Sequence, residues 1–77
     1  MKIIDMSRYK VNANPAGSTF IKGFVANVSG SYKLIDHIGN ETTTYLLQGH
    51  QYEIPFLVNI TESDGSKVTA GDITIWT

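Results

Sequence analysis

The hydrophobic and polar positions along this chain follow the pattern of β-strands. No segment long enough for a helix carries apolar residues at the three- and four-residue spacing of an amphipathic helix. Alternation with a period of two, which places successive side chains on opposite faces of a strand, recurs along the chain instead. It predicts strands over residues 2–6, 20–27, 32–36, 42–48, 52–61 and 72–76.

The strictest alternation lies between Tyr52 and Thr61. One face of this segment would carry five apolar residues, and we expect that face to be buried: Tyr52, Ile54, Phe56, Val58 and Ile60. The opposite face would carry Leu57 among mainly polar neighbours. Pro55 has no backbone N–H to donate to a neighbouring strand, so it predicts a sheet edge or a bulge at this point.

Glycine-containing turns separate the strand-like segments at short intervals, over residues 28–31, 38–40, 48–50, 64–66 and 70–72. Asp64-Gly65 has the composition of a two-residue hairpin turn. Short strands at this spacing predict an all-β fold, a small antiparallel sandwich or barrel of about six or seven strands with Greek-key or jelly-roll-like connections. We expect one domain over residues 1–77, with an N-terminal strand and loop over 1–18 and the sandwich core over 19–77.

Length and composition limit how such a domain is stabilised. A chain of 77 residues buries only a modest apolar core, and small domains commonly add disulfides, metals or oligomerisation. The chain has no cysteine, which removes disulfides and thiolate metal sites. This leaves association with further copies or with a larger body as the favoured means of stabilisation.

The charge pattern argues against nucleic-acid and membrane partners. The formal net charge is −1, and the six basic residues are scattered rather than gathered in a stripe that could follow a phosphate backbone. No apolar run approaches the ~20 residues of a membrane span. Asp5 and Arg8 interrupt the apolar start of the chain, so we expect no signal peptide and a soluble compartment.

Candidate catalytic groups are few. His37 follows Asp36 directly, and adjacent strand residues point to opposite faces, so the two would not form an acid–base pair. His50 lies in a glycine turn, and residues 64–66 and 71–72 lack the regular acidic spacing of a calcium loop. We therefore expect no enzyme activity, no cofactor, no metal and no small-molecule substrate.

Two binding alternatives use aromatic residues. Phe20, Lys22 and Phe24 on one strand are reminiscent of the platforms on which single-stranded nucleic acids stack, although a second aromatic strand is missing. Core aromatics explain the same pattern. A second alternative is a free-standing module for carbohydrate or a host surface, which would use four aromatic residues if they are exposed: Tyr32, Tyr45, Tyr52 and Trp76.

Apolar residues gather near the two ends of the chain and form the candidate protein interface: Ile3, Ile4, Met6, Tyr9 and Trp76. These residues either pack back onto the sandwich or contact neighbouring subunits, since Trp, Tyr and Met are enriched in interface cores. A short terminal strand can also pair with the sheet edge of a neighbour.

From Thr19 onward, the order of motifs follows a recognisable series. Residues 20–25 (Phe-Ile-Lys-Gly-Phe-Val) lead into the Ser29-Gly30 turn and then the threonine-bearing segment 42–44. Gly49, the Ile-Pro-Phe segment 54–56 and the closing segment 68–76 (Val-Thr-Ala-Gly-Asp-Ile-Thr-Ile-Trp) follow. In this order the chain resembles the head-spike base proteins of tailed phages and gene transfer agents. The chain departs from that family in three places. Lys22 stands where the family usually has arginine, the segment between Gly49 and Pro55 is longer than in the family, and the N-terminal third matches only loosely.

The resemblance implies a structural virion protein that acts through protein–protein contacts. It implies a small β-sandwich or barrel that assembles as a homo-oligomeric ring on the capsid surface and anchors a spike or fibre. Its partners would be itself, the capsid protein and the spike or fibre protein. Its location would be the virion, after synthesis in the host cytoplasm.

Overall fold

The computed structural model describes residues 3–8 and 20–77, which form seven strands and one short 3-10 helix. The elements are β1 (Ile3–Asp5), η1 (Met6–Arg8), β2 (Gly23–Ala26), β3 (Gly30–Asp36), β4 (Glu41–Leu46), β5 (Gln51–Tyr52), β6 (Leu57–Glu62) and β7 (Ile73–Trp76).

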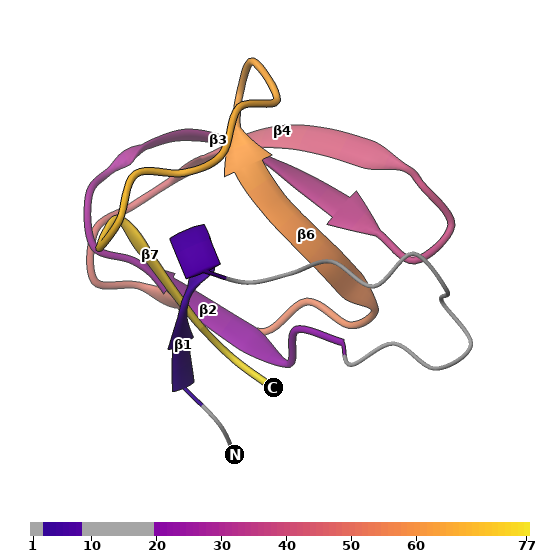
Figure 1. The fold of residues 1–77 in the computed structure, drawn as a ribbon, viewed down its shortest axis with the longest axis horizontal. Coiled ribbons are helices and arrows are strands. Elements are labelled where there is room, and N and C mark those ends of the chain that lie inside the picture. Colours follow the sequence, from indigo (N-terminus) through magenta and orange to yellow (C-terminus); the bar gives the residue numbers. More distant parts are fainter. Residues whose placement is uncertain (1–2, 9–19) are drawn as a thin grey trace.

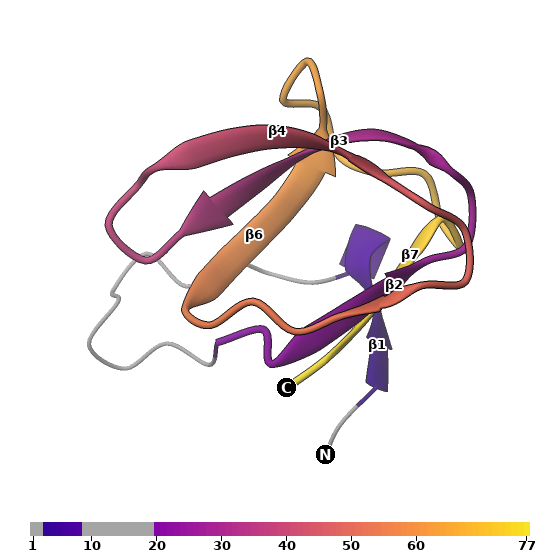
Figure 2. The same cartoon turned by 180° about the vertical axis from the view of Figure 1, so that it is seen from behind.

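The strands form two antiparallel sheets that pack face to face (Figure 1). The four-stranded sheet has the order β1-β7-β2-β5, and the three-stranded sheet has the order β4-β3-β6. The all-β sandwich expected from the alternation is therefore confirmed. From β2 onward, the chain passes from one sheet to the other at each connection except that between β3 and β4, which are neighbours in the same sheet (Figure 2).

The core lies between the sheets and is built from the inward positions of each strand. Phe24 and Ala26 of β2 and Ile73 and Ile75 of β7 are fully buried, as the period of two requires. Tyr32, Leu34, Leu46 and Ile60 face them from the three-stranded sheet, and Met6, Ile21, Leu57 and Val68 complete the buried cluster.

The segment from Tyr52 to Thr61 differs from its prediction as one strand. β5 ends at Tyr52 in one sheet and β6 begins at Leu57 in the other. Ile54 is 37% exposed and Phe56 is 54% exposed, while Leu57, expected on the outer face, is buried. The chain turns here because Pro55 lacks an N–H and Phe56 adopts a left-handed backbone conformation with φ of 65°.

A register shift within β6 explains why alternation fails beyond this turn as well. Ile35 pairs with Asn59 and Asp36 pairs with Leu57, so Val58 has no partner across the ladder. Such a bulge allows Leu57 and Ile60, three residues apart, both to point inward. The prediction that Ile60 is buried is confirmed, whereas the single buried face is wrong.

The turn at Asp64-Gly65 is longer than the predicted two residues. The N–H of Glu62 donates to the Ser66 carbonyl at 2.8 Å, and the N–H of Gly65 donates to the Glu62 carbonyl at 2.8 Å. Three residues thus lie between Glu62 and Ser66, with Gly65 at φ of 88°. This matches a three-residue turn with glycine in the left-handed position.

The N-terminal strand belongs to the sandwich itself. β1 pairs with β7 antiparallel, with Ile4 opposite Ile75. The side chain of Asp5 ties β1 to the turn before β7, because its Oδ2 accepts the N–H of Gly71 at 2.8 Å. Met6 enters the core, so the core draws on residues before position 19, where the sequence placed its boundary.

Candidate protein-binding surface

The outer face of the four-stranded sheet brings together residues from four strands. Ile3 of β1 and Gly23 of β2 both lie opposite Trp76 of β7. Two positions further along, and therefore on the same face, Val25 lies opposite Thr74 of β7 and Gln51 of β5. Since paired residues on neighbouring strands share a face, these side chains point away from the core.

These residues line a shallow groove of about 420 Å³, which we call the outer-face groove. Its lining residues are Ile3, Val25, Gln51, Glu53, Thr74 and Trp76. Three are large and apolar, and Ile3 is 65% exposed. The polar residues Gln51, Glu53 and Thr74 line the same groove, so it offers both apolar contact area and hydrogen-bonding groups.

Trp76 takes its place in the groove because Gly23 has no side chain. A Cβ atom added at Gly23 would lie 2.2 Å from Cζ2 and 2.4 Å from Cε2 of the indole. The indole therefore packs directly against the backbone of β2. The backbone N–H of Lys22 donates to the Trp76 carbonyl at 2.9 Å, so the hydrogen bonding between β2 and β7 extends to the end of β7.

The structure divides the five residues that the sequence proposed as an interface. Ile3 and Trp76, from opposite ends of the chain, are paired on the outer face. Ile4 packs against the core from the inner face, and Met6 is buried in it. Tyr9 lies outside the described residues. Ile3 and Ile4 are separated because successive side chains of a strand point to opposite faces of the sheet.

A second groove of about 440 Å³ adjoins the first and is lined by Phe20, Ile21, Lys22, Glu53, Pro55 and Phe56. Phe20 packs edge-on against Phe56 with ring centroids 5.6 Å apart, and the ring centroids of His37 and Phe56 are 5.2 Å apart. Glu53 lines both grooves, so they form one continuous surface. Phe56 was expected in the core, and no alternation pattern signals its exposure.

Four other residues of the outer-face groove escaped the sequence reasoning: Val25, Gln51, Glu53 and Thr74. Val25 and Thr74 could have been found, since each is the outward residue of a strand whose inward residues are apolar. Gln51 and Glu53 could not, because their position depends on β5 joining the edge of the four-stranded sheet.

The aromatic residues of the carbohydrate alternative do not share a face. Tyr32 is buried and its hydroxyl donates to the Val28 carbonyl at 3.0 Å. Tyr52 stacks on Phe24 with ring centroids 5.2 Å apart, and Tyr45 belongs to the other sheet. The nucleic-acid platform is not formed either, because Phe24 is fully buried while Phe20 contacts Phe56.

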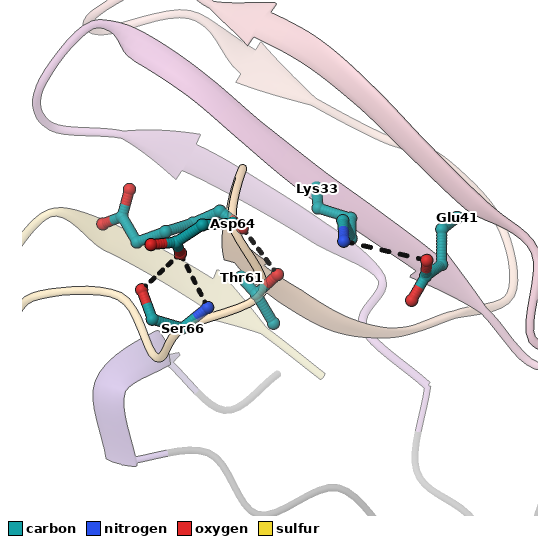
Figure 3. Close-up of polar contacts among 6 residues, drawn as sticks. Lys33, Glu41, Thr61, Asp64 and Ser66 are labelled. Atoms are coloured by element: carbon teal, nitrogen blue, oxygen red, sulfur yellow. Dashed lines mark hydrogen bonds and ion pairs between the residues drawn. The ribbon is translucent and has the colours of Figure 1, made fainter.

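The outer face of the three-stranded sheet carries mainly polar residues, with Tyr45 and Ile35 among them. Lys33 forms an ion pair with Glu41 at 3.7 Å, and the nearby Asp64 carboxylate accepts the Ser66 hydroxyl at 2.6 Å and its N–H at 2.9 Å (Figure 3). These hydrogen bonds, with a smaller contribution from the Lys33 charge, lower the pKa of Asp64. The charged residues Lys33, Glu41 and Asp64 thus have partners within the molecule.

The candidate chemistry considered from the sequence stays dispersed. His37 lies at the aromatic cluster and His50 beside Tyr52, with ring centroids 6.3 Å apart. Within residues 3–8 and 20–77, no three His, Asp or Glu side chains come together as a metal site would need. In the same residues no helix is long and apolar enough to cross a membrane.

Comparison with protein-family models, curated proteins and solved structures finds no match to this chain. The resemblance to head-spike base proteins therefore stays a prediction, and the surface must be interpreted from its own chemistry.

Proposed function

We propose that this chain is a non-enzymatic structural protein of a phage or phage-like virion. It acts as a small module on the capsid surface, a head-spike base, whose copies form a ring and anchor a spike or fibre through protein–protein contacts. The observation that carries the proposal is the outer-face groove, where the paired residues Ile3 and Trp76 expose apolar surface on a sheet whose other face is already filled by the core.

The chemistry of the groove favours a protein partner. Val25, Ile3 and Trp76 supply apolar contact area, while Gln51 and Thr74, which lie on either side of Val25, can exchange hydrogen bonds with a partner. Aromatic anchors at the centre of such a surface carry a large share of binding energy. The motif order along residues 19–77 supports the capsid as the body that is bound.

The proposal is tested on purified particles of the phage or phage-like element that encodes the chain. Particles made without the gene are mixed with purified chain, and bound chain is measured after sedimentation. We expect saturable binding of the wild-type chain and its detection in complete particles by mass spectrometry. Complete particles that contain no copy of the chain would contradict the proposal, as would stripped particles that fail to bind it.

A matched pair of variants locates the contact. Trp76→Ala removes the apolar centre of the outer-face groove, and we expect it to weaken particle binding. Thr43→Ala changes an exposed residue on the outer side of the three-stranded sheet, and we expect it to bind as the wild type does. Equal loss in both variants would show that the outer-face groove is not the binding surface.

A further inference from the structure

The edge strands of the two sheets differ in how open they are. β1 and β5, at the edges of the four-stranded sheet, have three and two residues, and Pro55 follows β5 closely. β6 carries the bulge, and its Leu57 carbonyl accepts the N–H of Ile21 at 2.9 Å. Short, interrupted or covered edges of this kind resist pairing with a strand from another molecule.

β4 is the exception among the described strands. It is a regular edge of six residues, with no proline, lysine or bulge. Glu41, Thr42 and Thr43 are exposed, and Tyr45 is 60% exposed. Threonine and tyrosine both favour extended backbone. β4 is therefore extended and accessible, as a strand that receives another strand must be.

Hydrogen bonding between β3 and β4 fixes which backbone groups of β4 are free. The N–H of Asp36 donates to the Asn40 carbonyl at 3.0 Å, which identifies this as a hydrogen-bonded pair. In an antiparallel ladder such pairs alternate with pairs that exchange no hydrogen bond. Because the register along β4 is regular, every second residue counted from Asn40 bonds to β3. The residues between them direct the N–H and the carbonyl to the open edge: Glu41, Thr43 and Tyr45. Within residues 3–8 and 20–77, no hydrogen bond from outside the ladder reaches these three residues.

A second copy of β4 matches this open edge group for group. When two β4 strands pair antiparallel about a twofold axis at Thr43, Thr43 lies opposite Thr43, and Glu41 lies opposite Tyr45 of the second copy. Each free residue then meets a free residue, and both backbone hydrogen bonds can form at every pair. An axis at Thr42 or Thr44 would pair only two of the three free residues in each copy.

The side chains permit the same register. Glu41 is the only charged residue of β4, and it would lie opposite Tyr45 rather than its own counterpart, so no like charges meet. On the inner face Thr42 would lie opposite Thr44, a pair that can share a hydrogen bond. Thr42 is exposed although it shares a face with the buried Leu34. The described part of the four-stranded sheet thus leaves the inner side of the edge open at this point.

We propose that β4 pairs with β4 of a second copy, antiparallel and in the register centred on Thr43. The two three-stranded sheets then join into one continuous sheet. Both copies use the same surface, so the contact closes at two copies. It goes beyond the proposed function and is independent of it, because it uses neither the outer-face groove nor the contacts of a ring.

Single cysteines map the register, because the chain has no cysteine of its own. Hydrogen-bonded partners on antiparallel strands have Cα atoms about 5.5 Å apart, within reach of a disulfide. Thr43→Cys should therefore form a linked dimer under mild oxidation. Glu41→Cys and Tyr45→Cys should link poorly alone, since each would lie more than ~13 Å from its own counterpart, and should link to each other when mixed.

Ser63→Cys, in the exposed turn after β6, measures linkage by random collision. On non-reducing gels, a yield for Thr43→Cys no greater than that for Ser63→Cys would overturn the proposal. Efficient linkage of Glu41→Cys to itself would overturn the register, as would a mixture of Glu41→Cys and Tyr45→Cys that links no better than either variant alone.

Thr43→Pro tests the hydrogen bonds without a cross-link. The N–H of Thr43 points away from β3, so proline removes a donor from the open edge and none from the ladder. Thr43→Ala keeps the N–H and is the matched control. In sedimentation equilibrium up to about 1 mM chain, we expect Thr43→Pro to dimerise at least about tenfold more weakly than Thr43→Ala.

Amide hydrogen exchange over the same concentrations shows whether β4 is the contact. In the wild type, the amides of Glu41, Thr43 and Tyr45 should become protected as concentration rises, because they gain partners only in the dimer. Amides of these residues that exchange equally fast at every concentration would overturn the proposal, as would equal dimerisation of Thr43→Pro and Thr43→Ala. The cysteine variants keep every backbone N–H, so they decide the question if proline lowers the melting temperature.

Discussion

The outer faces of the two sheets differ in how their side chains are satisfied. On the three-stranded sheet, Lys33 forms an ion pair with Glu41, and the Asp64 carboxylate accepts hydrogen bonds from the N–H and the hydroxyl of Ser66. On the four-stranded sheet, Ile3, Val25 and Trp76 form an apolar strip in a groove. Both sheets contribute inward residues to the same core, so the difference lies in what each sheet presents to its surroundings.

This contrast separates stability from binding. Polar groups that pair within the molecule lower the free energy of the folded chain by small amounts and offer little to a partner. Exposed apolar side chains stabilise the isolated chain little, yet they supply the energy of association when a partner covers them. Substitutions on the three-stranded sheet should therefore change unfolding, and substitutions on the outer-face groove should change binding.

The largest expected effect is that of Trp76→Ala on particle binding. An aromatic anchor at the centre of a surface commonly contributes about 2 kcal/mol or more, which corresponds to roughly thirtyfold weaker binding. A sedimentation isotherm with stripped particles measures this change. An unchanged dissociation constant would remove the distinction between the two outer faces.

Gly23→Ala should have the next largest effect, since the new Cβ would lie 2.2 Å from the indole and must displace it. Overpacking of this kind typically costs 1–3 kcal/mol, and we expect about 1 kcal/mol because the indole can move outward. Urea unfolding measures the cost, and the emission of the only tryptophan reports the movement. In a Trp76→Ala background the cost should vanish, and a cost that persists would place the strain elsewhere.

Tyr32→Phe tests a satisfied group in the three-stranded sheet. Losing the hydrogen bond to the Val28 carbonyl should lower the free energy of unfolding by about 1 kcal/mol and leave particle binding unchanged. Burial, followed by repulsion from Asp72 and Glu62, raises the pKa of Tyr32 above 10.0.

The raised pKa gives this variant a pH signature. The neutral hydroxyl favours the folded chain, so its contribution is complete below pH 10.0 and is lost as pH rises through the higher folded pKa. Urea unfolding at alkaline pH should show this loss in the wild type and a smaller one in Tyr32→Phe. Identical alkaline profiles in the two proteins would contradict the assignment.

The smallest effect is expected at the Asp64 turn. The hydrogen bonds from Ser66 lower the pKa of the Asp64 carboxyl below 3.8, so their contribution is present above that pH and is lost as pH falls through the folded pKa. Ser66→Ala removes the hydroxyl and keeps the backbone N–H, so the pKa of Asp64 should rise part of the way back. Carboxyl titration by NMR measures the change, and an unmoved titration curve would contradict it.

Local alternation was sufficient to predict the strands whose partners do not alter their period. For β7, Ile73 and Ile75 were expected to point inward, and both are buried. For β2, the alternation placed Phe24 and Ala26 on one face without deciding which face is inward, and the structure buries that face. The segment from Tyr52 to Thr61 failed because its second half pairs with β3 through a bulge, and a long-range register shift leaves no mark in the local pattern. Pro55 was the one residue that signalled a break.

The candidate surface was predictable only in part, for a related reason. Ile3 and Trp76 were singled out as apolar residues near the chain ends, but their meeting on the outer face depends on the pairing of β1 with β7. Ile4 and Met6 carried the same apolar signal and were placed in the core by the pleat and by η1. Composition identifies candidates, whereas strand pairing decides which of them share a face.

The central claim is that the outer-face groove of the four-stranded sheet meets the partner. Hydroxyl-radical footprinting of the chain, at one concentration with and without stripped particles, tests it directly. Ile35, on the outer side of the three-stranded sheet, provides a comparison of the same residue type as Ile3. We predict that Ile3 and Trp76 become protected on particles while Ile35 keeps its labelling rate. Protection of Ile35 with unchanged labelling of Trp76 would contradict the account.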